Sequence, residues 1–433
     1  MGGGLLQLVA YGAQDAYICG NPQITFWKGL YKRHTNFAME PFRINLTGQP
    51  AWGVKHSAIV GRHADLLYST YLEVIMEPGS EVNCEQGRLG YNLIKYVELD
   101  IGGQLIDRLY GEWLFLWDSI SNGYDQSIKT CYMTNGGLAG GPQTIPPQTQ
   151  CNVGSGRPSN PTVLYIPLTF FFTRNPGAAL PLIALQYHEV KINIQWNDAK
   201  IIAGNFNNAN SLADPVQAAV YIDYIYLDVE ERRRMAQQSH EYLIEQTQFN
   251  EDKGISSYNN RIDLTFNHPV KELVWVVQPN SHTNCSISKK FNQTRLKPFT
   301  YGGYNSSGTQ VEAVYDQLIQ INGQDRMDRR FGDYFTKVQL YQHHTGGGGG
   351  YANEILTTQR GIYMYSFALR PEEHQPSGTC NFSRIDTATI VMNLNGAIDM
   401  DEQQDKTYDV RVYAVNYNIL RIMSGMAGLA YSN

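Results

Sequence analysis

The sequence predicts an all-β protein built from two repeated units. Three observations lead to this prediction: apolar and polar residues alternate along many short segments, clusters of Gly, Pro and Asn separate those segments, and one stretch of sequence recurs later in the chain. Alternation with a period of two is typical of a strand with one buried face. Many short strands bounded by turn residues indicate sandwiches or barrels. A chain of 433 residues is long enough for at least two sizeable cores.

Strict alternation is clearest in Val190–Trp196, and Ala388–Leu394 repeats it with β-branched residues. The other predicted strands are 66–76, 93–101, 163–172, 216–227, 261–266, 272–277, 311–321, 362–369 and 409–420. Helical pattern is scarce. The best candidate is 228–245, which is rich in Glu, Arg and Gln and contains neither Gly nor Pro. We interpret residues 230–250 as a short helical connector between the two units.

An internal repeat sets the number of units at two. The segment GQLIDRLYGEWL at 103–114 matches GQDRMDRRFGDYF at 323–335 once one residue is gapped. The shared residues include Asp107, Arg108 and Gly111 in the first copy and Asp328, Arg329 and Gly332 in the second. We interpret the element as a tight turn in which a glycine supplies a positive φ, followed by a corner where the second glycine lets two backbones approach. The Asp and Arg side chains are expected to cap or pair locally. The predicted strand 220–227 matches 412–419 more weakly.

The repeat and the loop composition suggest the domain boundaries. We expect an N-terminal arm at 1–37, a first unit at 38–229 and a second unit at 251–433. Residues 135–161 are crowded with Gly, Pro, Gln and Asn, and residues 341–351 include a run of glycines. Such segments do not pack into a core, so both are expected to be surface loops.

Composition argues against several functions. Only 17% of the residues are charged, below the roughly 25% of typical soluble domains, while 12% are aromatic. A sparsely charged, aromatic-rich surface is suited to contact with other protein. The net charge of −6 and the lack of a basic tail disfavour direct binding of nucleic acid.

Motifs of catalysis and metal binding are missing from the sequence. GxSxG, GxxxxGK[ST], GxGxxG and HExxH do not occur. His343 and His344 could offer imidazoles to a metal ion, and 399–402 could attract a hard cation, but neither has ligands at the required spacing. We therefore expect no enzymatic activity, no cofactor and no metal.

The cysteines and the Asn-x-Ser/Thr sequons are considered as sites of disulfide formation and glycosylation. The six cysteines have no CxxC pair and are expected to be reduced and mostly buried. Asn-x-Ser/Thr sequons make the following residues candidate glycosylation sites: Asn45, Asn284, Asn292, Asn305 and Asn381. Since no secretory signal precedes them, these sequons occur at the level expected by chance for the standard pathway.

The run YSFALRPEEHQPSGTCNFSRID at 365–386 is long and has no generic structural explanation. It resembles the C-terminal signature of the major capsid proteins of nucleocytoplasmic large DNA viruses. Segments 7–15, 21–37, 227–245 and 420–431 resemble other blocks of the same family, so the resemblance spans the chain. Within the signature, the resemblance points to Glu373, His374, Gln375, Pro376, Ser377, Gly378, Asn381, Ser383, Arg384 and Asp386 as structural residues.

The resemblance implies a double jelly roll, that is, two consecutive eight-stranded antiparallel jelly rolls joined by the connector. It also implies a homotrimer whose six jelly rolls make a pseudo-hexagonal capsomer, many copies of which tile an icosahedral shell. The implied partners are neighbouring capsomers, minor capsid and penton proteins, and proteins of an inner membrane layer, with no direct nucleic acid. The implied location is the virion, after assembly in the host cytoplasm.

The same resemblance orients the expected parts. The arm 1–37 would lie on the inner face of the capsid, where Leu5, Leu6, Leu8 and Val9 could dock beneath a neighbour. The loops 135–161 and 341–351 would face outward. The alternative function is a jelly-roll carbohydrate-binding protein or glycan-active enzyme, suggested by the aromatic-rich strands.

Overall fold

The structure is a computed structural model. It describes residues 2–27, 29, 31–77, 89–135, 162–203, 212–283, 298–299, 301–304, 310–346, 361–395 and 407–431. The chain divides into two units, Met1–Phe37 and Ala38–Asn433. In the smaller unit, the short helices α1 (Gly3–Val9) and α2 (Asp15–Cys19) contain no buried residue. Among the described residues, no helix combines the length and the apolar character that crossing a membrane requires.

The larger unit begins with a jelly roll made of two sheets. One sheet has the order β1-β9-β3-β6 with β7 beside β3, and the other has the order β2-β8-β4-β5. Its strands are β1 (Phe37–Asn45), β2 (Lys55–Val60), β3 (Leu66–Met76), β4 (Ile94–Ile101), β5 (Gln104–Tyr110), β6 (Thr162–Pro167), β7 (Leu180–Pro181), β8 (Val190–Trp196) and β9 (Gln217–Leu227).

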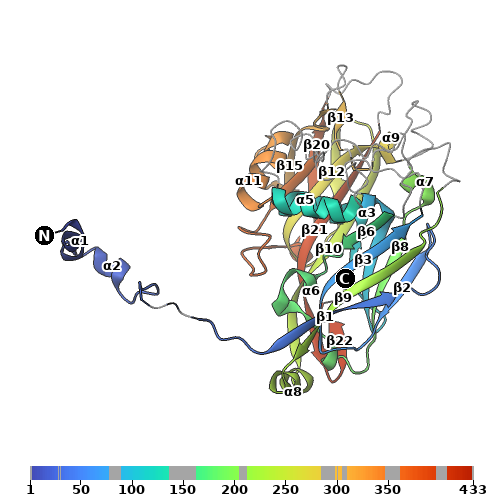
Figure 1. Cartoon of the computed structure of the whole chain (residues 1–433). Helices are drawn as coiled ribbons and strands as arrows, with labels where there is room; N and C mark the ends of the chain where they lie inside the picture. Colours follow the sequence, from blue (N-terminus) through green and yellow to red (C-terminus); the bar gives the residue numbers. More distant parts are fainter. Residues whose placement is uncertain are drawn as a thin grey trace. The chain divides into compact units, whose positions relative to one another are not determined.

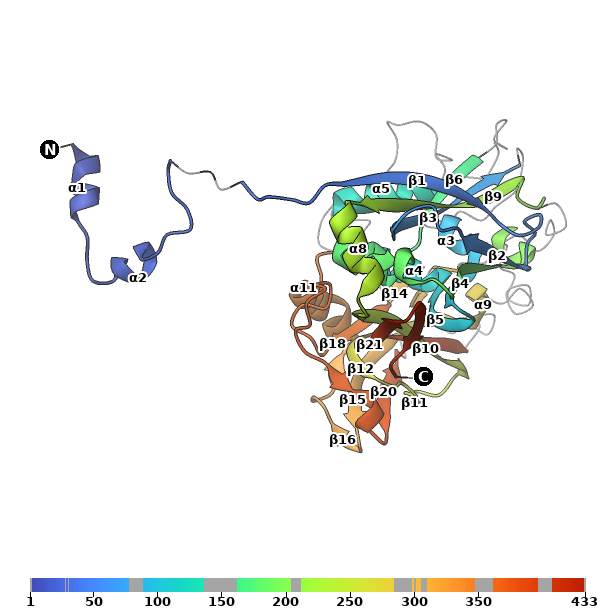
Figure 2. The same ribbon diagram turned by 90° about the horizontal axis from the view of Figure 1, so that it is seen from below.

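A second jelly roll repeats this arrangement. Its sheets are β10-β21-β12-β18, with β19 beside β12 and β22 beside β21, and β11-β20-β15-β16, with β17 beside β15. Its strands are β10 (His240–Ile255), β11 (Asn259–Asp263), β12 (Pro269–Pro279), β15 (Val314–Ile321), β16 (Gln324–Asp325), β17 (Arg330–Phe331), β18 (Ile362–Ser366), β19 (Cys380–Asn381), β20 (Ala388–Leu394), β21 (Tyr408–Met423) and β22 (Met426–Leu429). A separate pair joins β13 (Gly303–Tyr304) to β14 (Gln310–Val311). Figures 1 and 2 show the two jelly rolls side by side, and Figure 2 shows β5 of the first next to β10 of the second. The predicted double jelly roll is confirmed.

Short helices connect and flank the sheets. They are α3 (Leu89–Leu93), α4 (Gly111–Ser121), α5 (Tyr124–Asn135), α6 (Phe171–Arg174), α7 (Ala199–Ala203), α8 (Val229–Gln237), α9 (Asn280–Thr283), the π-helix η5 (Tyr334–Val338) and α11 (Gln339–His343), with 3-10 turns η2 (Pro176–Ala178), η3 (Leu182–Ala184) and η6 (Phe382–Arg384). The sequence pattern missed α4, whose run of Trp, Leu and Phe is apolar on every side. Such a helix has no polar face to reveal its period, and α4 is buried almost throughout.

The predicted helix over 228–245 is wrong in its second half. Helix α8 ends at Gln237, and the chain from His240 onward is the edge strand β10, paired with β21 along its length. Tertiary pairing therefore outweighs the helix propensity of the Glu- and Gln-rich run. The second jelly roll thus begins at His240, within the segment 230–250 that we had interpreted as a connector.

Most of the other predicted strands agree with the structure, but 163–172 is wrong in its second half, because β6 ends at Pro167 and α6 begins at Phe171. The segments 66–76, 190–196 and 388–394 are β3, β8 and β20 residue for residue. The predicted loop 135–161 lies almost wholly outside the described residues. The predicted loop 341–351 is wrong in its first part, because α11 extends to His343 and His344 is buried between two carboxylates.

Two large hydrophobic cores, with a small third cluster around Leu66, hold the described residues of the larger unit together. One lies inside the second jelly roll and includes Leu273 and Trp275 on the inner face of β12. The other fills the first jelly roll and continues into the second, where it includes Val274 and Val276 on the outer face of β12. Strand β12 is therefore buried on both faces, and the larger of the two cores extends across both jelly rolls.

Candidate functional site

The repeated hairpin and corner have the geometry that the repeat predicts. Gly102 and Gly103 between β4 and β5 have φ of 61° and 86°, and Asn322 and Gly323 have φ of 52° and 76° at the corresponding turn. Two consecutive positive φ values are the mark of the tight hairpin turn that suits twisted strands. Gly111 has no such φ. Instead, a Cβ there would overlap the carbonyl oxygens of Ile94 and Tyr91.

The first corner joins the two jelly rolls. The Asp107 carboxylate accepts a hydrogen bond from the Thr247 backbone N–H on β10 at 3.1 Å, and Gln246 on the same strand donates to the Ile106 carbonyl. Burial raises the pKa of Asp107 to about 7, although the N–H groups of Thr247 and Arg108 act in the opposite direction. The expectation of purely local pairing is therefore wrong for Asp107. Arg108 does pair nearby, with Glu98 on the adjacent strand at 2.6 Å.

Glu112, at the start of α4, is the centre of a buried polar cluster. Its two carboxylate oxygens accept hydrogen bonds from Arg411 on β21 at 2.6 and 2.7 Å. The hydroxyl groups of Tyr413 and Tyr301 donate to the same carboxylate at 2.6 and 3.1 Å. Burial alone would lower the pKa of Arg411, but the Glu112 carboxylate raises it overall, so the guanidinium stays charged. This bidentate ion pair fixes the orientation of α4 on the second jelly roll.

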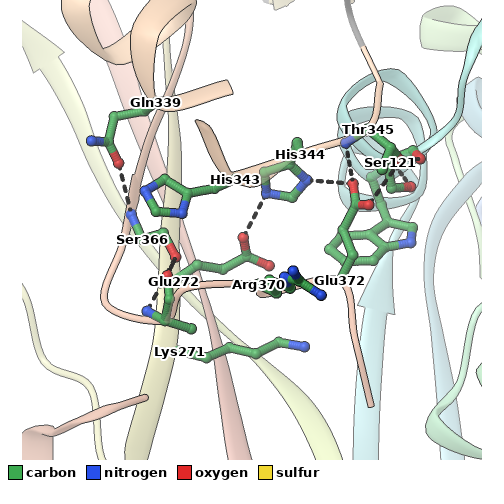
Figure 3. A network of polar contacts seen from close by, with 12 residues as sticks. Ser121, Lys271, Glu272, Gln339, His343, His344, Thr345, Ser366, Arg370 and Glu372 are labelled. Carbon is green, nitrogen blue, oxygen red and sulfur yellow. Dashed lines mark hydrogen bonds and ion pairs between the residues drawn. The ribbon is translucent and has the colours of Figure 1, made fainter. Parts of the chain in front are cut away.

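A second buried cluster lies around His344 (Figure 3). Its imidazole lies between Glu272 and Glu372, with each ring nitrogen 2.8 Å from a carboxylate oxygen. Burial acts to lower the pKa of His344, but the two carboxylates raise it to about 9. The ring is therefore protonated at neutral pH. The next residue, Thr345, donates to the Ser121 carbonyl at the end of α4, so this cluster also ties the two jelly rolls together.

Further ion pairs continue the junction. Lys271 is fully buried and lies 2.8 Å from Glu245, which also pairs with Arg174 of the first jelly roll at 2.6 Å. Burial acts to raise the pKa of Glu245, but Lys271 and Arg174 lower it overall. These ion pairs partly offset the cost of burying the charges and tie Arg174 of the first jelly roll to β10 and β12 of the second. In the part of the chain that the structure describes, no group of three or more His, Cys, Asp or Glu side chains could hold a metal ion.

The signature residues shape the loop after β18. Arg370 N–H donates to the Ser377 hydroxyl, Ser383 N–H donates to the Asn381 side chain, and His268 N–H donates to the Ser383 hydroxyl, all between 2.8 and 3.1 Å. Asp386 N–H donates to Asn322 at the hairpin turn. Gly378 has φ of 136°. The other signature residues of this loop lie at or near the surface: Glu373, His374, Gln375, Pro376 and Arg384.

The second corner is far more exposed than the first. Asp328 lies at the surface, and Arg329 pairs locally with Asp316 at 2.8 Å. Gly332 nevertheless repeats the close approach of Gly111, since a Cβ there would lie 2.5 Å from the Val314 carbonyl oxygen.

The candidate modification sites are only partly described. Asn45 is exposed at the end of β1, while the Asn381 side chain caps η6. Asn284, Asn292 and Asn305 lie outside the described residues. Cys19 is exposed and Cys131 and Cys380 are half-buried, so the expectation of mostly buried thiols is wrong for these three.

Sequence reasoning missed the residues that make the junction: Glu112, Glu272, His344, Glu372 and Arg411. One signal was available, because the repeat places an acid directly after the corner glycine in both copies, at Glu112 and Asp333.

Comparison with known proteins identifies the family of the chain. Residues 25–228 match the family model described as the N-terminus of major capsid proteins, and residues 231–428 match that of the large eukaryotic DNA virus major capsid protein. The chain belongs to this family. The resemblance seen in the 365–386 signature is therefore confirmed, and the protein is a major capsid protein of the large DNA virus type.

Close relatives match over the full chain. The major capsid protein of Pyramimonas orientalis virus is 45% identical, with both chains covered completely. Among solved structures, PBCV-1 VP54, fitted as a crystal structure into a cryo-EM reconstruction of the virophage Sputnik, is 34% identical with a TM-score of 0.77. That match covers 94% of this chain and 100% of VP54. A chain of the quasi-atomic model of the PBCV-1 virus capsid matches similarly, at 33% identity and a TM-score of 0.76 over the same shares of the two chains.

Proposed function

We propose that three copies of this chain form a pseudo-hexagonal capsomer, and that these capsomers tile an icosahedral shell. The observation that carries the proposal is the junction: two jelly rolls of the same strand order are locked into one rigid body by Glu112–Arg411, the His344 cluster and a shared core. One chain thus supplies two similar lobes at a set angle, and three chains supply six. The role is structural, without catalysis.

Native mass spectrometry and negative-stain microscopy test this proposal. We expect a particle of three times the 48.9 kDa chain mass with a hexagonal outline. A protein that is well folded but strictly monomeric at all concentrations would contradict it. Neighbouring capsomers, minor capsid proteins and penton proteins are the proposed partners, and the host cytoplasm is the proposed place of assembly.

The N-terminal arm is proposed to bind other shell components on the inner face. Its apolar side chains are exposed within their own unit, including Leu8 at 80%, Phe26 at 93% and Trp27 at 90%. Exposed apolar side chains in such number mark a segment that binds protein or lipid. Replacing Leu5, Leu6, Leu8 and Val9 with Ser should leave capsomers intact but reduce their incorporation into shells or their binding to membrane-layer proteins. Unchanged shell yield and unchanged binding would contradict this role.

Asn45 is the proposed glycan attachment point among the described sequons, because it is exposed and lies at a strand end. Intact-mass measurement of virion-derived protein with and without Asn45→Gln tests this. An identical mass, apart from the substitution itself, would rule out a glycan at this residue.

A further inference from the structure

The corresponding sheets of the two jelly rolls differ in how their outer faces are covered. In the second jelly roll, Val274 on β12 and Tyr413 and Val415 on β21 point outward from their own core and are buried against the first jelly roll. In the first jelly roll, β3 alternates between buried and half-buried residues from Thr70 to Met76, and β9 does so around Tyr221 and Asp223. Within the part of the chain that the structure describes, the outer face of this first sheet is therefore only half-buried.

Tyrosines dominate that half-buried face. Tyr71 on β3 stacks on Tyr221 of β9 with ring centroids 5.2 Å apart, and it meets Tyr165 of β6 edge-on at 6.0 Å. Tyr165 is 37% exposed. We call these three residues the tyrosine face. Large, rigid rings with a polar tip are typical of protein interfaces.

An aromatic side chain at the first corner covers part of the outer face of the second jelly roll's sheet. Tyr110, immediately before Gly111, packs against Phe249 of β10 at a centroid distance of 4.5 Å and against Tyr413 at 6.2 Å. The repeat places Phe331 at the position of Tyr110 in the second jelly roll. Phe331 is 63% exposed and contacts Tyr315, itself 47% exposed, at 5.4 Å. We call Phe331 and Tyr315 the aromatic corner.

The receiving positions correspond as well. In the second jelly roll, Tyr413 is the register partner of Val274 on β12. In the first, Tyr221 is the register partner of Tyr71 on β3. The matched strands 220–227 and 412–419 place Tyr221 and Tyr413 at the same point of the repeat. The chain therefore carries an exposed copy of the covering element and a half-buried copy of the surface that it covers, and the two are not in contact among the described residues.

We propose that the aromatic corner of one copy docks on the tyrosine face of a second copy, and so repeats between chains the Tyr110–Tyr413 contact made within a chain. This rests on the proposed trimer, in which three such head-to-tail contacts close a ring. The two interfaces differ in one respect. Arg411 corresponds to Ala219, and Asp333, the counterpart of Glu112, pairs with Lys337 of its own helix. The contact between chains is therefore mainly aromatic and lacks a copy of the buried Glu112–Arg411 pair.

Cysteine cross-linking tests the docking directly. The double variant Phe331→Cys/Tyr221→Cys, treated with oxidised glutathione, should give covalent dimers and trimers on a non-reducing gel. The matched control Phe331→Cys/Ile59→Cys places the second thiol on β2, at an exposed residue of the opposite sheet. On the same denaturing, non-reducing gel it should run as a single chain without cross-links, as the wild type does. Equal cross-linking in both double variants, or none in the first, would overturn the proposal.

A charge placed in the corner provides a second measurement. Phe331→Asp should lower the trimeric fraction about tenfold or more, because a buried aromatic anchor is lost to a charge. Tyr258→Asp changes an exposed aromatic residue outside the corner and should leave the trimer intact. A wild type that never trimerises refutes the proposed function itself. A wild-type trimer that persists unchanged in Phe331→Asp refutes only this docking surface.

Discussion

The two corners that follow the repeated hairpins share a sequence pattern but not an environment. At the first, the buried Asp107 is bound to β10 of the second jelly roll and Glu112, whose side chain is 15% exposed, is bound to β21. At the second, Asp328 and Asp333 are exposed, and Asp333 pairs with Lys337 one helical turn away. The backbone is alike in both, since each corner glycine approaches a carbonyl closely. Local sequence therefore determines the shape of a corner, while the partner surface determines what its side chains contribute.

The corner glycines are expected to give the largest effect and to affect both jelly rolls. Gly111→Val and Gly332→Val each place a Cβ against backbone carbonyls that cannot move aside. Each substitution should lower the free energy of unfolding by more than about 4 kcal/mol. The loss should be larger at Gly111, where the added Cβ would overlap two carbonyl oxygens. Soluble yield and urea unfolding measure this. Wild-type stability and trimer yield in both variants would show that close approach is unimportant.

The acids after the glycines should separate the two corners most clearly. Glu112→Gln leaves Arg411 buried without its counter-charge, which costs about 3–5 kcal/mol. Asp333→Asn removes an exposed pair with Lys337 and should cost less than about 1 kcal/mol. Urea unfolding at one protein concentration compares them. Equal losses would mean that the buried cluster adds nothing to the junction.

His344 gives the junction a dependence on pH. Its pKa of about 9 exceeds the usual 6.5, so protonation stabilises the fold fully below pH 6.5, and this stabilisation is lost as the pH rises through 9. His344→Gln leaves Glu272 without its cation and should cost about 3 kcal/mol at pH 7. The difference in unfolding free energy between this variant and the wild type should become smaller as the pH rises from 6.5 to 9.

The neighbouring His343→Gln is the matched control, because His343 is half-buried and bonds a backbone carbonyl. It should show no such narrowing. Thermal unfolding scans from pH 6 to 10 provide the measurement, and a pH-independent deficit in His344→Gln would contradict the charged state of the ring.

Asp107 and Asp328 should show the smallest difference. Asp107→Ala leaves the Thr247 N–H buried without an acceptor and should cost about 1–3 kcal/mol. Asp328→Ala changes an exposed side chain and should stay within about 0.5 kcal/mol of wild type. Chemical denaturation of the two variants measures both losses. Equal losses would mean that the bond from Asp107 to the second jelly roll does not stabilise the junction.

Much of the fold could be predicted from the sequence, because strands with one buried face display their period directly. Val190–Trp196 and Ala388–Leu394 are such strands. Helix α4 could not be predicted, since its run of Trp, Leu and Phe at 113–117 is apolar on every side and buried, so it shows no helical period. The candidate site was harder still. His344 meets Glu272 and Glu372 only because α11, β12 and the loop after β18 converge, and nothing in the local sequence places a carboxylate beside it.

The sequence by itself determined the family, through the resemblance of its 365–386 signature. It also determined the number of repeated units and the two tight hairpin turns, because these depend on periodicity, repetition and the freedom of glycine to adopt positive φ. Only the tertiary structure decided which copy of each repeated element is buried. Asp107 and Asp328 look alike in the chain, but a carboxylate acquires its pKa, its partners and its energetic weight from the surface packed against it.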